Sequence, residues 1–400
     1  MLSSFLKAES ISRSLLLIPY LWLAIGIIWM PQGNKPLVAL VLVAAIVHIF
    51  IYGLFQIKSN FKSNVWLWGT LLAGMFTLIG YVTYGASSQE LRGFLVTTVL
   101  LCALPQKQLL NAKLAQYLLF SAALACLALS CWYFFIYPTE RIFWPTNPIP
   151  LATHQGLIST LSVGALLTNF KGKITWMLVV SAIISGFSLI LTQSRGVILG
   201  VGVLYIVIGL ILLYQRKINI KIILLSLTLC FGAVFLSEEA IVERYDQTWK
   251  EISKIEQGDL NSSIGLRLQM YQAGIELFES SPILGHGSLN REYIEENIPG
   301  YTPRAYGFIS EGHLHNNYID KLARSGIIGL SIFLFFIFYP VYLGLRKYPD
   351  LFWLFSLPSI HYAVASLTDS PFRNGDALVV YLIVTGTLVH YAKIKYKEKL

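Results

Sequence analysis

Two histidines separated by a single residue are the groups in this sequence best suited to moving a proton. His313 and His315 lie in the stretch Glu-Gly-His-Leu-His-Asn-Asn-Tyr, residues 311–318. Histidine titrates near neutral pH, so its imidazole can take a proton from a hydroxyl group. Alternate side chains of an extended segment point to opposite faces, and neither a cysteine nor a third histidine is near enough in sequence to complete a zinc site. The pair therefore favours one general base with a supporting neighbour over two ligands of one metal; ordinary surface histidines are the alternative.

An arginine between two apolar runs is the first candidate for binding an anion. Arg195 follows Thr-Gln-Ser at 192–194 and precedes Gly196. An arginine at a tight turn is costly if it faces lipid, whereas its guanidinium binds phosphate through two parallel hydrogen bonds. Arg195 could therefore hold an anion, or it could extend its charged end to the lipid headgroups.

A second arginine begins a predicted amphipathic helix. Apolar residues at 264, 268, 271, 275 and 278 have helical spacing, the polar residues 261–263 could cap the helix, and Pro282 would end it. Arg267 falls in the first turn, where a cation is unfavourable to the helix dipole and an anion is favoured. This placement indicates an anionic partner for Arg267, with a solvated surface arginine as the alternative.

Three further charged residues are weaker candidates. Asp369 and Arg373 flank Pro371 in a short loop, where they could line a cavity or belong to a simple turn. Arg141 lies in the segment 138–152, which is rich in proline and aromatic residues.

The composition indicates which elements must position these residues. Of the 400 residues, 55% are hydrophobic and 13% are charged, whereas soluble proteins have roughly 25% charged residues. The apolar residues form long runs, and a helix of about 20 apolar residues crosses the bilayer with all its backbone groups hydrogen-bonded. The four cysteines lie in these runs and show neither a disulfide framework nor metal-ligand spacing.

An all-α membrane protein with about twelve transmembrane helices is therefore the expected fold class. The fourth and eleventh of the predicted spans are short, so their assignment as spans is the weakest. The spans cover residues 14–30, 36–55, 65–84, 92–106, 115–137, 153–169, 174–191, 196–214, 218–236, 326–345, 351–366 and 376–392.

The distribution of cations predicts the orientation of these spans. When the loops are counted alternately, the set that includes both termini holds seventeen lysines and arginines, and the short loops of the other set hold five. Because cytoplasmic loops are enriched in lysine and arginine, both termini are expected in the cytoplasm. These loops also account for most of the net charge of +9, so we expect membrane lipids and no nucleic acid as partners.

One polar segment interrupts the apolar runs. Residues 237–325 contain 14 of the 21 acidic residues and 8 of the 30 cations, and a loop of this length usually carries function. The predicted organisation is thus nine spans in 1–236, a large and mainly helical periplasmic loop in 237–325, and three spans with a basic cytoplasmic tail in 326–400.

The motifs and this organisation together resemble the bacterial O-antigen ligase family. The resemblance is carried by Arg195 after Thr-Gln-Ser, by Ile-Gly-Leu-Arg-Leu-Gln-Met-Tyr at 264–271 and by His-Leu-His-Asn at 313–316. It is concentrated in residues 190–200 and 261–330, and in topology it extends over the chain. The wider superfamily includes O-antigen polymerases and protein O-oligosaccharyltransferases.

The resemblance implies a reaction at the periplasmic face of the bacterial inner membrane. O-antigen polysaccharide would move from undecaprenyl pyrophosphate to a sugar hydroxyl of lipid A–core, with inversion at the anomeric carbon and without a metal or other cofactor. Arg195 and Arg267 would hold the pyrophosphate, His315 would be the general base, and His313 would support it.

Three alternatives remain open. An O-antigen polymerase would share the donor and the arginines, although polymerases are often built with more than one sizeable outward loop. A transporter of lipid-linked sugars would be expected to carry charged or polar residues within its spans or two broken-helix halves, whereas the predicted spans are nearly clean. A structural membrane scaffold would leave the arginines and histidines without a role.

Overall fold

The described residues of the chain form helices and no strands. The computed structural model describes residues 2–62, 64–105, 109–137, 143–144, 146–168, 175–215 and 238–397. The expected all-α class is therefore confirmed over these ranges. The helices are α1 (Leu2–Ala24), α2 (Asn34–Tyr52), α3 (Phe55–Phe61), α4 (Val65–Tyr84), α5 (Ser88–Cys102), α6 (Ala112–Cys131), α7 (Pro148–Leu167), α8 (Trp176–Leu191), α9 (Arg195–Tyr214), α11 (Glu238–Glu256), α12 (Ser263–Ser280), α13 (Arg291–Asn297), α14 (Pro303–Glu311), α15 (Asn317–Tyr342), α16 (Phe352–Ala365) and α17 (Gly375–Lys397).

Seven helices in the described part of the chain are long and apolar enough to cross a membrane. They are α1, α2, α4, α6, α9, α15 and α17. The chain is thus a multi-pass membrane protein. Four further predicted spans correspond to α5, α7, α8 and α16, which are shorter or more polar. The predicted span 218–236 lies outside the described residues, so the count of twelve stays a prediction.

Helix α7 corrects the expectation of clean spans. All of its residues from Leu151 to Ser162 are buried, and several of them are polar. Several of their polar groups are bonded inside the bundle: the Gln155 amide nitrogen donates to Ser130 Oγ at 2.9 Å, and Ser159 pairs with the Tyr205 hydroxyl at 2.6 Å. A buried helix can contain such polar residues because they bond inside the bundle and need not face lipid. The expectation of clean spans assumed that the helices face lipid.

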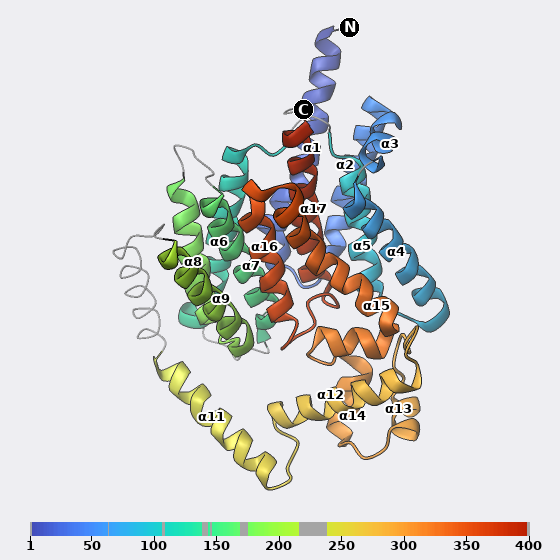
Figure 1. Cartoon of the computed structure of the whole chain (residues 1–400), viewed down its shortest axis with the longest axis vertical. Coiled ribbons are helices and arrows are strands. Elements are labelled where there is room, and N and C mark those ends of the chain that lie inside the picture. Colours follow the sequence, from blue (N-terminus) through green and yellow to red (C-terminus); the bar gives the residue numbers. More distant parts are fainter. Residues whose placement is uncertain are drawn as a thin grey trace.

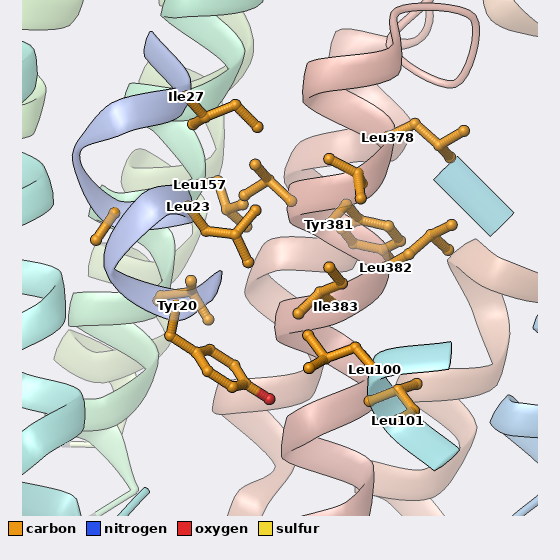
Figure 2. Packing of buried hydrophobic residues seen from close by; sticks show 14 of the residues in the cluster. Tyr20, Leu23, Ile27, Leu100, Leu101, Leu157, Leu378, Tyr381, Leu382 and Ile383 are labelled. Carbon is orange, nitrogen blue, oxygen red and sulfur yellow. The ribbon is translucent and has the colours of Figure 1, made fainter. Parts of the chain in front are cut away.

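The core of the bundle is built around α17. Figure 2 shows Leu378, Tyr381 and Leu382 of this helix facing apolar side chains of α1, α5 and α7. Tyr381 is fully buried, and its hydroxyl donates to the carbonyl of Phe336 on α15. Because α17 and α15 are fixed in this way, the loop before α17 and the outer end of α15 have defined positions.

Helices α11 to α14 lie at the end of the molecule opposite both termini (Figure 1). Three of them, α12, α13 and α14, share a small core of their own, which also includes Leu314 and Ala323. α15 continues this region and bends at Gly326, whose φ of 59° breaks the helix. The predicted span beginning at residue 326 therefore starts at this bend.

The limits of α12 follow the sequence signals, but its buried face does not. Ser262 caps the helix by accepting the backbone N–H of Gly265, and the helix ends at Ser280, before Pro282. However, Leu268 and Ile275, which belong to the predicted apolar face, are about half exposed. The buried face instead includes small residues such as Gly265, Ala273 and Gly274, which hydropathy does not single out.

Candidate active site

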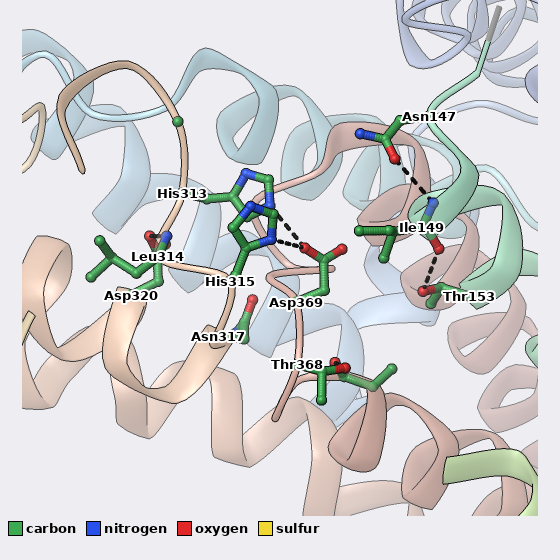
Figure 3. Close-up of polar contacts among 12 residues, drawn as sticks. Asn147, Ile149, Thr153, His313, Leu314, His315, Asn317, Asp320, Thr368 and Asp369 are labelled. Carbon is green, nitrogen blue, oxygen red and sulfur yellow. Dashed lines mark hydrogen bonds and ion pairs between the residues drawn. The ribbon is translucent and has the colours of Figure 1, made fainter. Parts of the chain in front are cut away.

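The two histidines bind the same carboxylate oxygen. His313 Nε2 lies 2.8 Å and His315 Nδ1 lies 3.1 Å from Asp369 Oδ1, as Figure 3 shows. The centroids of the two rings are 4.2 Å apart. The expectation that they point to opposite faces is therefore wrong. The reason is the backbone of His315, whose φ of 49° is left-handed rather than extended.

Side chains of helix α15 bind the backbone of the segment that carries the two histidines. Asp320 Oδ1 accepts the backbone N–H of Leu314 at 3.2 Å and also binds Arg324 Nε at 3.2 Å. Arg324 Nη2 donates to the carbonyls of Ile309 at 2.7 Å and of Gly312 at 3.3 Å. A buried ion pair thus fixes the backbone on both sides of His313, which supports the left-handed conformation at His315.

Two asparagines join this segment to the loop that carries Asp369. Asn316 caps α15 and donates to the carbonyl of Leu367 at 3.3 Å. Asn317 donates its backbone N–H to the carbonyl of Ser366 at 2.8 Å, and its side-chain oxygen accepts the N–H of Phe372 at 3.0 Å. The position of Asp369 relative to the histidines therefore depends on backbone bonds on either side of it.

The shared carboxylate separates the two imidazoles electrostatically. Burial lowers the pKa of His313, but the hydrogen bond and charge of Asp369 outweigh it, so this pKa is raised. Burial also lowers the pKa of His315, and the neighbouring His313 adds to this, so the net shift is downward. Burial raises the pKa of Asp369, yet the hydrogen bonds of both histidines hold this pKa well below its usual value. At neutral pH the arrangement therefore favours an ionised Asp369 and a neutral His315.

A cavity of about 490 Å³ lies against His315 and is lined by cations. Arg195 of α9 and Arg267 of α12 both line it, so the structure brings these two predicted residues and His315 to one space. Lys254 and Arg304, which the sequence analysis did not single out, line it as well. They had no signal in the sequence beyond their place in the polar segment, because their meeting depends on how α11, α12 and α14 pack.

Arg195 reaches the cavity because two helices meet there in a tight turn. Gln193 has a left-handed φ of 54° between α8 and α9, which confirms the predicted turn. The next glycine, Gly196, packs so closely on Thr368 that a Cβ would overlap the Thr368 side chain. This close approach places the start of α9 beside the loop of Asp369.

Arg267 and the histidine segment are connected through one helix. Tyr271, one turn after Arg267 on α12, donates its hydroxyl to the carbonyl of His315 at 3.0 Å. Arg267 itself makes no hydrogen bond or ion pair with any residue that the structure describes. Burial is the largest cause that lowers the pKa of His315, and the positive charge of Arg267 lowers this pKa further.

The weaker candidates have different positions. Asp369 lies at the centre of the site. Arg373 does not line the cavity, and its Nη1 is 4.0 Å from Glu90 Oε1, which also pairs with Lys321 through its second oxygen. Arg141 lies outside the described residues.

The same three side chains could hold a metal ion. His313, His315 and Asp369 offer ligand atoms that all lie within 4.8 Å of one another. Two imidazoles and a carboxylate are a ligand set that zinc accepts, and the sequence analysis did not foresee Asp369 as the third member. The expectation of a metal-independent site therefore stays a prediction.

Comparisons with known proteins find similarity to O-antigen ligases. Residues 180–334 match the family model described as O-Antigen ligase. A protein of Escherichia coli K12 named "O-antigen ligase" is 22% identical over 313 residues, which is 73% of each chain. An uncharacterized protein of Haemophilus influenzae is 26% identical over 217 residues, and this match spans about half of each protein, 52% of this chain and 54% of the relative. The region of the family match includes both arginines and both histidines, whereas Asp369 lies beyond it.

Proposed function

We propose, from the match of residues 180–334 to the O-antigen ligase family model, that the chain transfers O-antigen polysaccharide from undecaprenyl pyrophosphate to a sugar hydroxyl of lipid A–core. The family and the E. coli relative support, at the coarser level, a ligase- or polymerase-type enzyme of O-antigen processing. The proposal adds the donor, the acceptor and the periplasmic side of the inner membrane as the place of reaction.

The donor diphosphate binds in the cation-lined cavity. Arg195 and Arg267 hold its oxygens, because guanidinium groups bind phosphate in a fixed fork. As the bond between the anomeric carbon and the diphosphate breaks, the electron pair stays on the diphosphate. Fixed cations in a partly enclosed site stabilise that developing charge, typically by several kcal/mol.

His315 takes the proton of the acceptor hydroxyl. Its Nδ1 faces Asp369, so we assign the proton to Nδ1 and the lone pair to Nε2. The acceptor oxygen attacks the anomeric carbon while Nε2 accepts its proton, and the diphosphate leaves from the opposite side. A positioned base of this kind contributes roughly 10² to 10⁴ in rate.

His313 and Asp369 determine the orientation and the protonation of His315. Asp369 fixes the orientation of the His315 ring and stabilises the imidazolium that forms during the step. His313, with its raised pKa, shares the negative charge of Asp369. One displacement inverts the anomeric carbon and needs no covalent intermediate on the enzyme.

The observation that carries the proposal is the single cavity that joins Arg195, Arg267 and His315. These residues are far apart in sequence and come from three different elements. A transfer from a diphosphate to a hydroxyl requires cations that bind the diphosphate and a base that faces the same space.

The test is a gel of lipopolysaccharide from cells whose own copy is deleted. The cells carry the wild type, His315→Ala, Arg267→Ala, or Arg291→Ala as a control, since Arg291 is exposed and pairs with Glu295 away from the cavity. We expect deletion to leave lipid A–core without an O-chain ladder while lipid-linked polymer accumulates. The wild type and Arg291→Ala restore the ladder, and the other two variants do not, at equal protein levels.

The polymerase alternative predicts a different gel. Deletion would then leave core capped with a single repeat unit, because ligation continues and polymerisation stops. That pattern would replace the ligase reading with the polymerase reading. Restoration of the full ladder by His315→Ala would remove this residue from the mechanism.

A further inference from the structure

The cation-lined cavity has one acidic side chain among its lining residues, Glu251 of α11. Its Oε1 lies 3.7 Å from Arg195 Nη2, and its Oε2 accepts the backbone N–H of Ile264 on α12 at 2.9 Å. The side chain of Glu251 is 17% exposed and that of Arg195 is 38% exposed. A carboxylate therefore lies against the guanidinium that the proposed function assigns to the donor.

Helix α11 contacts Arg195 twice. Besides Glu251, Thr248 accepts a hydrogen bond from Arg195 Nη1 through its hydroxyl. The two residues are three positions apart and so lie on neighbouring turns of one helix face. Arg195 is thus engaged by α11 on both of its terminal nitrogens.

Two of the other three cavity cations, Arg267 and Arg304, have no carboxylate partner of this kind among the described residues. Among the residues that the structure describes, Arg267 has no hydrogen bond or ion pair, and Arg304 donates only to the carbonyl of Asn261, at 3.4 Å. With Lys254, the lining holds four cations against one acid. The acid is placed on the one cation that belongs to the membrane bundle, at the start of α9.

A carboxylate and a phosphate bind a guanidinium in the same manner, through charge-assisted hydrogen bonds to its N–H groups. Both cannot occupy the same N–H group at once. We infer that Glu251 competes with the donor diphosphate for Arg195: its carboxylate holds the guanidinium when the cavity lacks a diphosphate, and it gives way when one binds. This inference rests on the proposed role of Arg195.

The competition has a consequence for turnover. Four cations that stabilise the departing diphosphate also retain it as a product. A carboxylate that returns to Arg195 favours release, so removing its charge strengthens diphosphate binding and product inhibition. A Glu251 that only orients Arg195 has the opposite effect, because its loss would weaken diphosphate binding.

The experiment measures the binding of inorganic pyrophosphate to the purified full-length chain by calorimetry. Glu251→Gln keeps the shape and removes the charge, and Glu251→Ala removes the contact. Glu256→Gln is the matched control, because Glu256 is exposed on the same helix and does not line the cavity. Arg195→Gln tests the site itself, and the double variant Arg195→Gln/Glu251→Gln tests whether the two residues act together.

We expect Glu251→Gln and Glu251→Ala to bind pyrophosphate about twofold to fivefold more tightly than the wild type, the size of one partly exposed ion pair. Glu256→Gln leaves the affinity unchanged, and Arg195→Gln weakens it. In the Arg195→Gln background, the Glu251 substitution has no further effect. In transfer assays, Glu251→Gln lowers the KM for donor and lowers the pyrophosphate concentration that inhibits.

Two different failures can be told apart. If Arg195→Gln weakens binding but both Glu251 variants bind equally or more weakly than the wild type, the competition is refuted and the proposed diphosphate site stands. If Arg195→Gln leaves the affinity unchanged, the assignment of Arg195 to the diphosphate fails, and the inference about Glu251 fails with it.

Discussion

At the scale of single residues, one carboxylate oxygen decides how the two histidines differ. Asp369 Oδ1 contacts both rings, at 2.8 Å and 3.1 Å. The charge of the carboxylate raises the pKa of each histidine, but only at His313 does this outweigh burial. His315, which lines the cavity, is the histidine whose pKa is lowered. A lowered pKa suits a general base, which must be neutral before it accepts a proton.

The first prediction concerns Asp369. Asp369→Asn keeps the size of the side chain but removes the charge that stabilises a protonated His315. We expect the turnover number to fall by about 10² to 10⁴ with little change in the KM for donor, since the cavity cations remain. Asp246→Asn on α11 is the control, because Asp246 is exposed and away from the cavity. Equal turnover of the two variants in a transfer assay would exclude a role for Asp369 in the base.

The second prediction concerns pH. A protonated His315 cannot accept the hydroxyl proton, so the transfer rate falls as pH drops through the pKa of this residue. Burial, together with His313, lowers that pKa from its ordinary value of 6.5. The acid limb of the rate profile should therefore lie below pH 6.5, with full activity at neutral pH. An acid limb centred above pH 7 would be incompatible with His315 as the base.

The third prediction concerns metal. The ligand atoms of His313, His315 and Asp369 could hold an ion, but in the proposed step they are engaged with one another and the arginines neutralise the diphosphate. We expect dialysis against a chelator to leave the transfer rate unchanged and added zinc not to increase it. Loss of activity on chelation with recovery on adding zinc would instead make the cluster a metal centre.

At the scale of elements, the site depends on close contacts between helices and loops that are far apart in the sequence. α9 brings Arg195 from the bundle, α12 brings Arg267, and the loop before α17 brings Asp369. The contact between Gly196 and Thr368 connects the first of these to the third. A change of a few tenths of an ångström there moves Arg195 relative to the base.

The fourth prediction uses two glycines of α9. A Cβ at Gly196 would overlap Thr368, whereas one at Gly202 would meet no atom within 4 Å. Gly196→Ala should lower the transfer rate about tenfold and destabilise the fold by about 1–3 kcal/mol, the usual cost of overpacking. Gly202→Ala should change neither. The melting temperature and the transfer rate of both variants in detergent test this, and equal behaviour of the two would contradict the close approach.

The same elements indicate what could be predicted from the sequence. Capping residues and Pro282 predicted the limits of α12, and the position of Arg195 between two apolar runs predicted the turn, because these signals are local in the sequence. The buried face of α12 was predicted wrongly, since it is formed by Leu266, Met270 and Leu277 together with small residues, and not by the apolar residues whose spacing was used. The sequence also did not predict the positive φ of His315 or the position of Asp369 between the two histidines. Both depend on hydrogen bonds to α15 and to the backbone of the loop before α17, which are far apart in the sequence.

At the scale of the whole molecule, the arrangement of the ends agrees with the distribution of cations. Both termini lie at one end of the bundle, and α11 to α14 lie at the other (Figure 1). The cation-lined cavity belongs to this second end, where Arg195 begins α9. In the proposed reaction, a lipid-linked donor and a lipid-linked acceptor would both reach it by diffusion within one leaflet.

The fifth prediction tests which side of the membrane this end faces. The excess of lysine and arginine in the loops of the termini predicts that α11 to α14 face the periplasm. Ser253 on α11 is exposed, and Lys395 lies near the end of α17, next to the C-terminus. We expect a membrane-impermeant maleimide added to intact spheroplasts to label Ser253→Cys above the wild-type background. It should label Lys395→Cys only after the membrane is permeabilised. The reverse pattern would place the cavity in the cytoplasm, where it could not meet a donor at the periplasmic face, and the proposed reaction would fail even if every residue of the site proved necessary.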